Sequence, residues 1–246
     1  MGYNTKPSMI LFDVGGTLFK GGNFSAYNGL EALRLQALNP EATDTATMAE
    51  LWDSYADEIG SGHKSVSGTT LDFPLSAALK FITMKSGLRF DIPMYAQEEI
   101  FDRYNSERKL INGITELLET ASSLGIRTAV ISNNAMSGES LAIAVKQWIP
   151  TSEMEFCLTS ADILLSKPDR KIFDIALNYA GLKAENCWYC GDSFTPDVYG
   201  AKRAGLTPVL IDVKSSLPVQ FKSEADVGEY MIVNNWNELK KHLLNI

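Results

Sequence analysis

The segment Ser8–Leu18 (Ser-Met-Ile-Leu-Phe-Asp-Val-Gly-Gly-Thr-Leu) constrains the fold more than any other part of the chain. Its four apolar residues, Met9 to Phe12, run without a polar break, which is typical of a strand buried on both faces of a parallel sheet. The run ends on the carboxylate of Asp13, and two glycines then allow the backbone to turn sharply and to approach a ligand closely. A carboxylate at the end of a buried strand is costly unless a metal ion or a reacting phosphorus offsets it. Taken alone, the segment is equally compatible with an aspartate that only caps a strand–loop corner.

The composition is that of an ordinary globular protein, with 45% hydrophobic and 21% charged residues. The length of 246 residues suits one large α/β domain, or one domain that carries an insertion. The net charge of −8 argues against nucleic acid or an anionic membrane as the main partner. No apolar run approaches the roughly 18 residues of a membrane span. We therefore expect a cytoplasmic protein, and the sequence leaves both a monomer and a homodimer open.

The region from Ser25 to about Arg108 has helical periodicity. The amphipathic stretches that predict four helices are Tyr27–Leu38, Met48–Ile59, Leu75–Met84 and Tyr95–Tyr104. The polar stretch Gly60–Thr70 lies between the second and third helices and is typical of a loop. Its His63 and Lys64 could reach a site if the helices close over one, although an exposed loop pair is the simpler interpretation.

Strands and helices alternate from Ile111 to the end of the chain. The predicted strands are Arg127–Ile131, Phe156–Thr159, Asn186–Gly191, Pro208–Ile211 and Tyr230–Val233, and the predicted helices are Ile114–Leu124, Ser140–Trp148, Asp169–Tyr179, Thr195–Ala204 and Asn235–Leu244. This alternation predicts an α/β fold in which helices cover both faces of a parallel sheet. We assign residues 1–20 and 108–246 to this core and residues 21–107 to an all-helical insertion.

Three of the predicted strands end in polar residues. These residues are Asp13, Ser132-Asn133 and Asp192. Because the ligand crevice of an open parallel sheet lies outside the carboxyl ends of its strands, they should converge. Asp197, in the first turn of the next helix, and Lys167, at the entry to another, should lie at the same edge. Each residue has a simpler explanation by itself, such as a helix dipole for Asp197 or a turn for Ser132 and Asn133. Their placement at one edge favours a functional site.

Cys187 and Cys190 have the spacing of a redox or zinc motif. They fall in a predicted strand, where positions three apart point to opposite faces. The chain has three cysteines, which provide neither a second ligand pair nor a disulfide framework. We therefore predict that these cysteines have no metal or redox role.

The chain resembles the haloacid dehalogenase-like hydrolase superfamily in four motifs that occur in the family's order between Met9 and Gly205. The motifs are Asp13-Val-Gly-Gly-Thr17-Leu18, the apolar strand ending in Ser132-Asn133, Lys167-Pro168, and Gly191-Asp192-Ser-Phe-Thr-Pro-Asp197 followed by the Gly200–Gly205 helix. The resemblance implies a Rossmann-like parallel sheet flanked by helices. The helical insertion after the first motif is similar to the family's helical cap subtype, which implies a mobile cap over the crevice.

The resemblance also implies the roles of the substrate-facing residues. Asp13 would be the nucleophile that forms an aspartyl intermediate with the substrate. Ser132 and Lys167 would hold the transferring group, and Lys167 would offset its negative charge. Thr17 and Asn133, from the same motifs, would contribute to substrate binding.

The metal site implied by the resemblance holds Mg²⁺. Its ligands would be Asp13, the backbone carbonyl of Gly15, and Asp192, with Asp197 coordinated to the ion or directly behind its ligands. The physical chemistry agrees, because a hard dication with oxygen ligands cancels the repulsion between an attacking carboxylate and a phosphate.

Gly15 departs from the family pattern. Phosphatases of the family carry a second aspartate at this position, two residues after the nucleophile, as general acid and base. Gly15 can offer its carbonyl to a metal ion but cannot provide a proton, so we expect a preference for leaving groups of low pKa. The dehalogenase and phosphonatase branches also lack this aspartate, but they usually have an aromatic residue or alanine there.

We therefore favour a Mg²⁺-dependent hydrolase of a small phosphorylated metabolite. The alternatives are a dehalogenase or phosphonatase, and a binding protein that has lost turnover together with the acid. Retention of Asp192 and Asp197 counts against a metal-free dehalogenase. The segment Asp13–Thr17 also resembles the first phosphate loop of actin-like sugar kinases, but no second loop of the Asp-x-Gly-Thr type follows, and 246 residues are few for two such domains.

Overall fold

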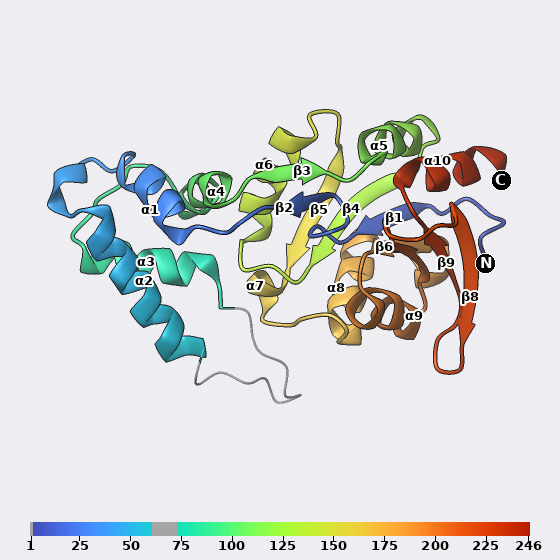
Figure 1. Cartoon of the computed structure of the whole chain (residues 1–246). Helices are drawn as coiled ribbons and strands as arrows, with labels where there is room; N and C mark the ends of the chain where they lie inside the picture. Colours follow the sequence, from blue (N-terminus) through green and yellow to red (C-terminus); the bar gives the residue numbers. More distant parts are fainter. Residues whose placement is uncertain (1, 61–72) are drawn as a thin grey trace.

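The computed structural model describes residues 2–60 and 73–246, so His63 and Lys64 lie outside the described residues. One sheet runs through the molecule in the order β5–β4–β1–β6–β7–β9–β8 (Figure 1). Its strands are β1 (Met9–Phe12), β4 (Arg127–Ser132), β5 (Met154–Thr159), β6 (Cys187–Gly191), β7 (Thr207–Ile211), β8 (Val219–Glu224) and β9 (Gly228–Val233). All neighbours pair in parallel except β8 and β9, which confirms the predicted parallel sheet.

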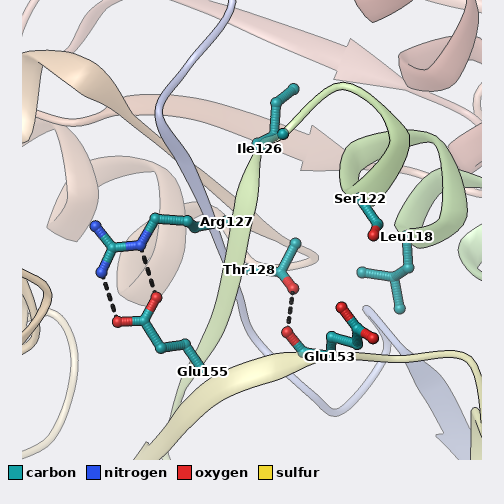
Figure 2. Close-up of a pocket in the computed structure, with 8 residues that line it drawn as sticks. Leu118, Ser122, Ile126, Arg127, Thr128, Glu153 and Glu155 are labelled. Atoms are coloured by element: carbon teal, nitrogen blue, oxygen red, sulfur yellow. Dashed lines mark hydrogen bonds and ion pairs between the residues drawn. The ribbon is translucent and has the colours of Figure 1, made fainter.

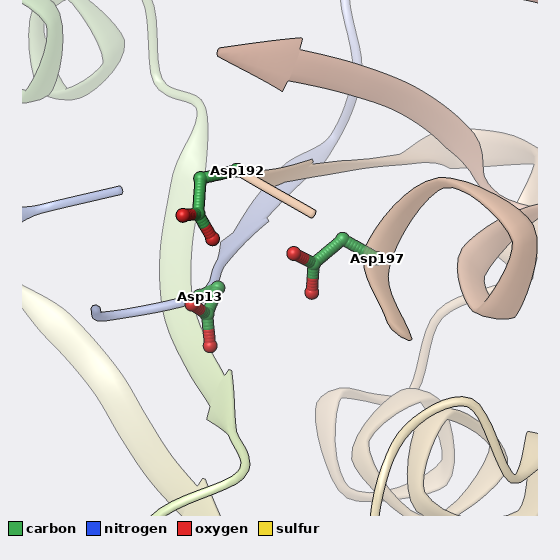
Figure 3. Close-up of side chains that lie close together, drawn as sticks. All are labelled: Asp13, Asp192 and Asp197. Atoms are coloured by element: carbon green, nitrogen blue, oxygen red, sulfur yellow. The ribbon is translucent and has the colours of Figure 1, made fainter. Parts of the chain in front are cut away.

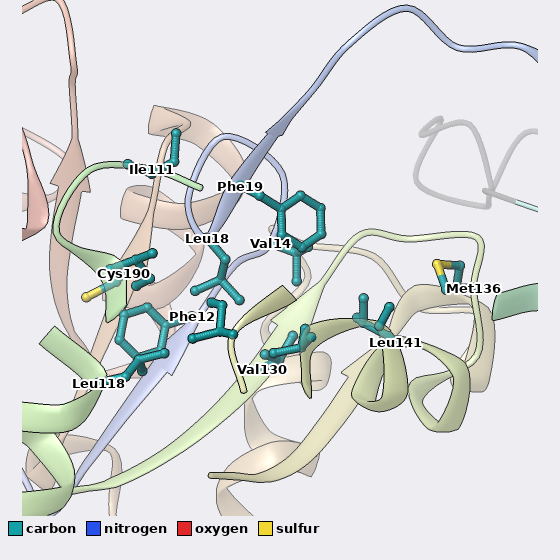
Figure 4. Close-up of a cluster of buried hydrophobic side chains, with 14 of the residues drawn as sticks. Phe12, Val14, Leu18, Phe19, Ile111, Leu118, Val130, Met136, Leu141 and Cys190 are labelled. Carbon is teal, nitrogen blue, oxygen red and sulfur yellow. The ribbon is translucent and has the colours of Figure 1, made fainter. Parts of the chain in front are cut away.

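Helices cover both faces of the sheet. Those on one face are α5 (Ile114–Ser123), α6 (Gly138–Trp148) and α10 (Trp236–Asn245), and those on the other are α8 (Arg170–Ala180) and α9 (Gly200–Ala204). The short helix α7 (Ser160–Ile163) follows β5. Side chains of β1 alternate between the two cores, so Phe12 packs with α5 and α10 while Leu11 packs with α8. Figure 4 shows Phe12 and Val14 within the first of these cores.

Cys187 and Cys190 point to opposite faces of β6 and belong to different cores. Both are free thiols. Burial raises the pKa of Cys187 to about 11 and the pKa of Cys190 well above its ordinary value. The predicted opposite orientation of the two side chains is therefore confirmed.

The predicted helical insertion contains α1 (Ala26–Arg34), α2 (Thr45–Gly60), α3 (Leu75–Lys85), α4 (Met94–Asn105) and the short 3₁₀ turn Pro40–Ala42. It lies to one side of the sheet (Figure 1). The strands that lead into and out of it, β2 (Phe19–Gly21) and β3 (Arg108–Leu110), pair with each other in antiparallel fashion. Neither strand was predicted from the sequence, because a three-residue strand is too short to show alternation.

Buried Glu98 on α4 links the insertion to the core. Its carboxylate accepts hydrogen bonds from the backbone N–H of Ser76 (2.9 Å), at the start of α3, and from the backbone N–H (3.3 Å) and the hydroxyl of Ser137, the N-cap of α6. Burial raises the pKa of Glu98 despite these hydrogen bonds. The backbone N–H of Leu75 also donates to the carbonyl of Ala135 (2.7 Å). These contacts seat the insertion on the loop that follows β4.

Other elements differ from prediction where the sequence lacks a periodic apolar pattern. Strand β8 was missed because its residues are half-buried or exposed at the sheet edge. The helix predicted from Thr195 instead begins at Phe194, with a π-helical segment, Phe194–Tyr199, that leads into α9. None of the described helices combines the length and apolarity needed to cross a membrane.

A surface cavity of about 240 Å³ lies at the amino end of β4 (Figure 2). Arg127 forms an ion pair there with Glu155 (Nε–Oε2 2.6 Å), and the hydroxyl of Thr128 donates to the carbonyl of Glu153 (3.1 Å). The cavity is therefore at the opposite end of β4 from Ser132 and plays no part in the site described next.

Candidate active site

The carboxyl ends of the parallel strands meet around one cavity of about 330 Å³. Its lining consists of Asp13, Val14, Gly15, Phe19, Ser132, Asn133, Asn134, Lys167, Asp192, Ser193, Pro196 and Asp197. Figure 3 shows Asp13, Asp192 and Asp197 approaching one another from separate segments. The structure thus brings together every residue predicted for the site except Thr17.

Asp13 follows β1 and stays in register with β6, because its N–H donates to the carbonyl of Cys190 (2.8 Å). Its carboxylate accepts hydrogen bonds from the hydroxyl of Ser132 (3.0 Å) and the ammonium of Lys167 (2.7 Å), both at Oδ1. Among the described residues, these contacts leave Oδ2 available to a metal ion or a substrate. This is the arrangement that an oriented carboxylate nucleophile needs.

Lys167 is buried, and its ammonium has three acceptors. Nζ lies 2.7 Å from Asp13 Oδ1, 2.7 Å from Asp197 Oδ1 and 2.7 Å from the hydroxyl of Tyr189. Burial alone would lower the pKa of Lys167, but the two carboxylates outweigh burial and hold that pKa above its ordinary value. The two carboxylates therefore favour the charged form of Lys167, whose ammonium holds the Asp13 carboxylate in place.

Asn133 holds the backbone of Lys167. Its side-chain Oδ1 accepts from the Lys167 N–H (2.7 Å), and its Nδ2 donates to the Lys167 carbonyl (2.9 Å). The predicted substrate contact of Asn133 therefore competes with two intramolecular hydrogen bonds. In this structure its amide positions the lysine.

Asp197 and Asp192 complete the acidic group. Asp197 is buried, and its second oxygen, Oδ2, accepts from the N–H of Ser193 (2.9 Å). Burial raises the pKa of Asp197 although Lys167 opposes the shift, and burial together with the charges of Asp13 and Asp197 raises the pKa of Asp192. One carboxylate oxygen from each of the three acids lies within 4.8 Å of the others.

This donor set fits Mg²⁺. Lys167 is the single basic side chain among the described residues that line the cavity, so three carboxylates face one ammonium. The remaining negative charge favours a hard divalent cation, whose preferred ligands are carboxylate and carbonyl oxygens. Gly15, whose carbonyl is the predicted backbone ligand, lines the same cavity. Both oxygens of Asp197 already accept hydrogen bonds, which favours a place for Asp197 behind the ligands.

The two glycines of the first motif have different roles. Gly16 has φ +70°, and a Cβ there would lie 2.1 Å from Oδ2 of Asp192. Gly15 has no positive φ, and a Cβ there would meet nothing within 4 Å. Gly16 therefore approaches the side chain of Asp192 closely, and the approach of this turn to a ligand stays a prediction.

Two residues fall outside the predicted pattern. Thr17 does not line the cavity; its hydroxyl is buried without a partner in the described part of the chain, while its carbonyl accepts from the indole N–H of Trp236 (2.7 Å). Tyr189, which our sequence analysis missed, donates to the carbonyl of Ile131 (2.8 Å) and accepts from Lys167. A tyrosine inside a buried strand was the available signal, since a buried phenol requires a hydrogen-bond partner.

The family model of the haloacid dehalogenase-like hydrolases matches residues 53–211, and the chain belongs to this family. The match contains Ser132, Lys167, Asp192 and Asp197 and begins after Asp13. Family membership makes the chain a hydrolase and sets aside the sugar-kinase alternative.

Individual relatives and structures agree with this assignment. The chain is 27% identical over 135 residues to a glyceraldehyde 3-phosphate phosphatase of Methanothermobacter thermautotrophicus, which covers 52% of this chain and 56% of the relative. It is 30% identical over 137 residues to the haloacid dehalogenase-like hydrolase domain-containing protein 3 of Xenopus laevis, covering 56% of this chain and 53% of the relative. The chain therefore spans about half the length of these curated relatives. A 2-haloacid dehalogenase of Pseudomonas syringae shares the fold, with a TM-score of 0.57, 20% identity, and coverage of 96% of this chain and 98% of that one.

The contrast between Gly16 and Gly15 gives a matched test. We expect Gly16→Ala to lower the free energy of unfolding by about 1–3 kcal/mol, because it combines a positive φ with a clash against Asp192. Gly15→Ala should change it by less than about 0.5 kcal/mol, as is usual for a substitution into open space. Urea unfolding of both variants measures the difference. Equal destabilisation by the two substitutions would contradict the geometry described for this turn.

Proposed function

We propose that the chain is a Mg²⁺-dependent phosphatase of a small phosphorylated metabolite that acts through an aspartyl-phosphate on Asp13. The observation that carries the proposal is the group of three carboxylates, two of them paired with buried Lys167, in which one oxygen of Asp13 is held and the other is available. The relatives named glyceraldehyde 3-phosphate phosphatase support phosphate-ester hydrolysis as the reaction class. The position of the helical insertion beside the site supports its role as a cap.

The proposed reaction has two steps. Oδ2 of Asp13 attacks phosphorus, the new O–P bond forms, and the bond to the leaving oxygen breaks with its electron pair on that oxygen, which takes a proton from solvent. Water then attacks the phosphoryl group on Asp13 and loses a proton to solvent, the bond between phosphorus and Asp13 breaks, and inorganic phosphate leaves with the carboxylate restored. Lys167 and Ser132 keep Asp13 oriented during both steps. Mg²⁺, held by Asp13, the Gly15 carbonyl and Asp192, would supply the charge neutralisation that lets two anions meet.

The metal part of the proposal is tested by calorimetric titration of Mg²⁺ into the protein. We expect Mg²⁺ to bind the wild type and to raise its melting temperature, since only the folded chain assembles the ligands. At a Mg²⁺ concentration of a hundred times Kd, binding adds about 2.7 kcal/mol to the free energy of unfolding. Asp192→Ala should lose both effects, while Asp226→Ala, in the exposed turn between β8 and β9, should retain them. A wild type that shows no heat of binding and no thermal shift would overturn the metal assignment.

The missing acid at position 15 predicts how rate depends on the leaving group. A positioned general acid typically contributes about 10²–10⁴-fold. Without one, log(kcat/KM) should fall steeply as the leaving-group pKa rises, so aryl and acyl phosphates should react faster than simple alkyl phosphates.

Gly15→Asp tests the role of this position directly, because the backbone and the space around it accept a side chain. The variant should flatten the dependence on leaving-group pKa and raise alkyl phosphate turnover more than aryl phosphate turnover, while Gly15→Ala keeps the steep dependence. A flat dependence in the wild type, with chemistry shown to limit the rate, would mean that another residue supplies the proton.

The alternatives make different predictions in the same assays. A carbon–halogen hydrolase would release halide from a 2-haloacid without Mg²⁺, and a phosphonatase would cleave a carbon–phosphorus bond. A binding protein that has lost turnover would take up Mg²⁺ but release no phosphate from any substrate. The three clustered carboxylates favour the phosphatase over a metal-free reaction.

A further inference from the structure

A second cavity, of about 400 Å³, lies between the helical insertion and the core. We call it the aromatic cavity and define it by Phe24, Trp52, Phe73 and Phe101, which line it. It shares Gly15, Phe19 and Asn134 with the cavity around Asp13, so the two cavities adjoin at these residues. The leaving group of a substrate whose phosphorus lies at Asp13 would therefore be next to the aromatic cavity.

Aromatic rings from separate parts of the insertion form one wall. Trp52 on α2 stacks on Phe101 of α4, with ring centroids 4.9 Å apart and an interplanar angle of 24°. The ring of Phe24, from the segment before α1, has its centroid 6.1 Å from that of Trp52 and 6.3 Å from that of Phe101. Phe24 is nevertheless 59% exposed, so its ring is available for a further contact. Apolar and aromatic surfaces of this kind are typical of small-molecule sites.

The charged groups of the aromatic cavity neutralise each other. Asp102 and Arg108 are the two charged side chains among its described lining residues, and they form a buried ion pair. Arg108 also donates to the backbone carbonyl of Asp102 (3.0 Å), and its guanidinium lies over the ring of Phe19, 5.1 Å from the centroid. A substrate with a charge on its leaving group, in addition to its phosphate, would find no unpaired counter-ion among these side chains. Burying that additional charge would be costly.

We propose that the aromatic cavity binds the leaving group of the substrate and that this group is an uncharged aromatic alcohol, making the substrate an aryl phosphate monoester. This inference rests on the phosphatase function proposed above. An apolar cavity of roughly 150 Å³ holds benzene in a known case, so about 400 Å³ accommodates a substituted or fused ring. In the reaction, the bond between phosphorus and the aryl oxygen breaks, the aryloxide keeps the electron pair, and it takes its proton from water.

The identity of residue 15 supports the same substrate class independently. An aryloxide is a far more stable leaving anion than an alkoxide, so its departure needs less help from a general acid. Gly15 lies where the two cavities meet and offers no proton. An aromatic wall on one side and a missing acid at the junction both favour aryl over alkyl phosphates.

Two substrates separate ring recognition from leaving-group stability: 2-naphthyl phosphate has a ring, whereas acetyl phosphate has a good leaving group without one. We expect Trp52→Ala and Phe24→Ala each to lower kcat/KM for 2-naphthyl phosphate by about tenfold or more, as loss of an aromatic contact implies. Acetyl phosphate hydrolysis should change by less than about twofold, because the phosphoryl site is untouched. Tyr27→Ala, an exposed aromatic residue of α1 outside the cavity, is the control and should leave both activities unchanged.

Binding of 2-naphthol, followed by calorimetry, keeps this inference distinct from the proposed function. We expect the wild type to bind 2-naphthol and both cavity variants to bind it about tenfold more weakly or worse. If 2-naphthol binds in this manner but no phosphate is released from either substrate, the phosphatase proposal fails while the aromatic site stands. If both substrates are hydrolysed and the cavity variants affect them equally, or affect neither, the aromatic leaving-group site is wrong. Circular dichroism of each variant establishes that it is folded.

Discussion

The rest of the site depends on the ion pairs that the buried ammonium of Lys167 forms with Asp13 and Asp197. A buried charge is tolerated only when it is paired and hydrogen-bonded, and Lys167 meets that condition through Asp13, Asp197 and Tyr189. These partners come from the end of β1, the π-helical segment after β6, and β6 itself. Loss of Lys167 would leave Asp13 and Asp197 as buried like charges without their shared counter-ion. The same contacts that make the lysine acceptable therefore hold the acids in a constellation that attracts a cation.

The backbone interactions around this ion pair explain why sequence-distant motifs must occur together. Asn133, at the end of β4, holds the backbone of Lys167 at both its N–H and its carbonyl. Tyr189 is tied to β4 through the carbonyl of Ile131. Gly16 leaves the space that Asp192 occupies. The motifs of the family thus hold one another in place through these contacts.

The parallel sheet and the group of side chains at its edge could be predicted from the sequence, because apolar runs and the polar residues that end them indicated the same arrangement. Continuous apolar runs defined the buried strands, and parallel pairing then required Asp13, Ser132 and Asp192 to meet at one edge. Prediction failed for elements that are too short or too exposed to show a periodic apolar pattern, and for contacts between residues far apart in the sequence. Strand β2 is too short for periodicity, β8 is an exposed edge strand, and the link between Trp236 and the Thr17 carbonyl joins opposite ends of the chain. The aromatic cavity could not be predicted from the sequence either. Trp52 and Phe101 fit the pattern of ordinary amphipathic helices, and Phe24 lies in the segment before α1, so nothing in the sequence indicates that the three rings meet.

In the proposed mechanism, Asp13 carries the phosphoryl group during turnover. The most direct measurement mixes the enzyme and Mg²⁺ with an excess of 4-nitrophenyl phosphate, quenches the mixture in acid within the first turnovers, and locates any added mass by peptide mapping. We predict one phosphoryl group on the peptide that contains Asp13, accumulating because Gly15 leaves the second step without a base, and none on the Asp13→Asn variant. Steady release of phosphate with no phosphoryl group on Asp13, or with unchanged turnover by Asp13→Asn, would contradict the account.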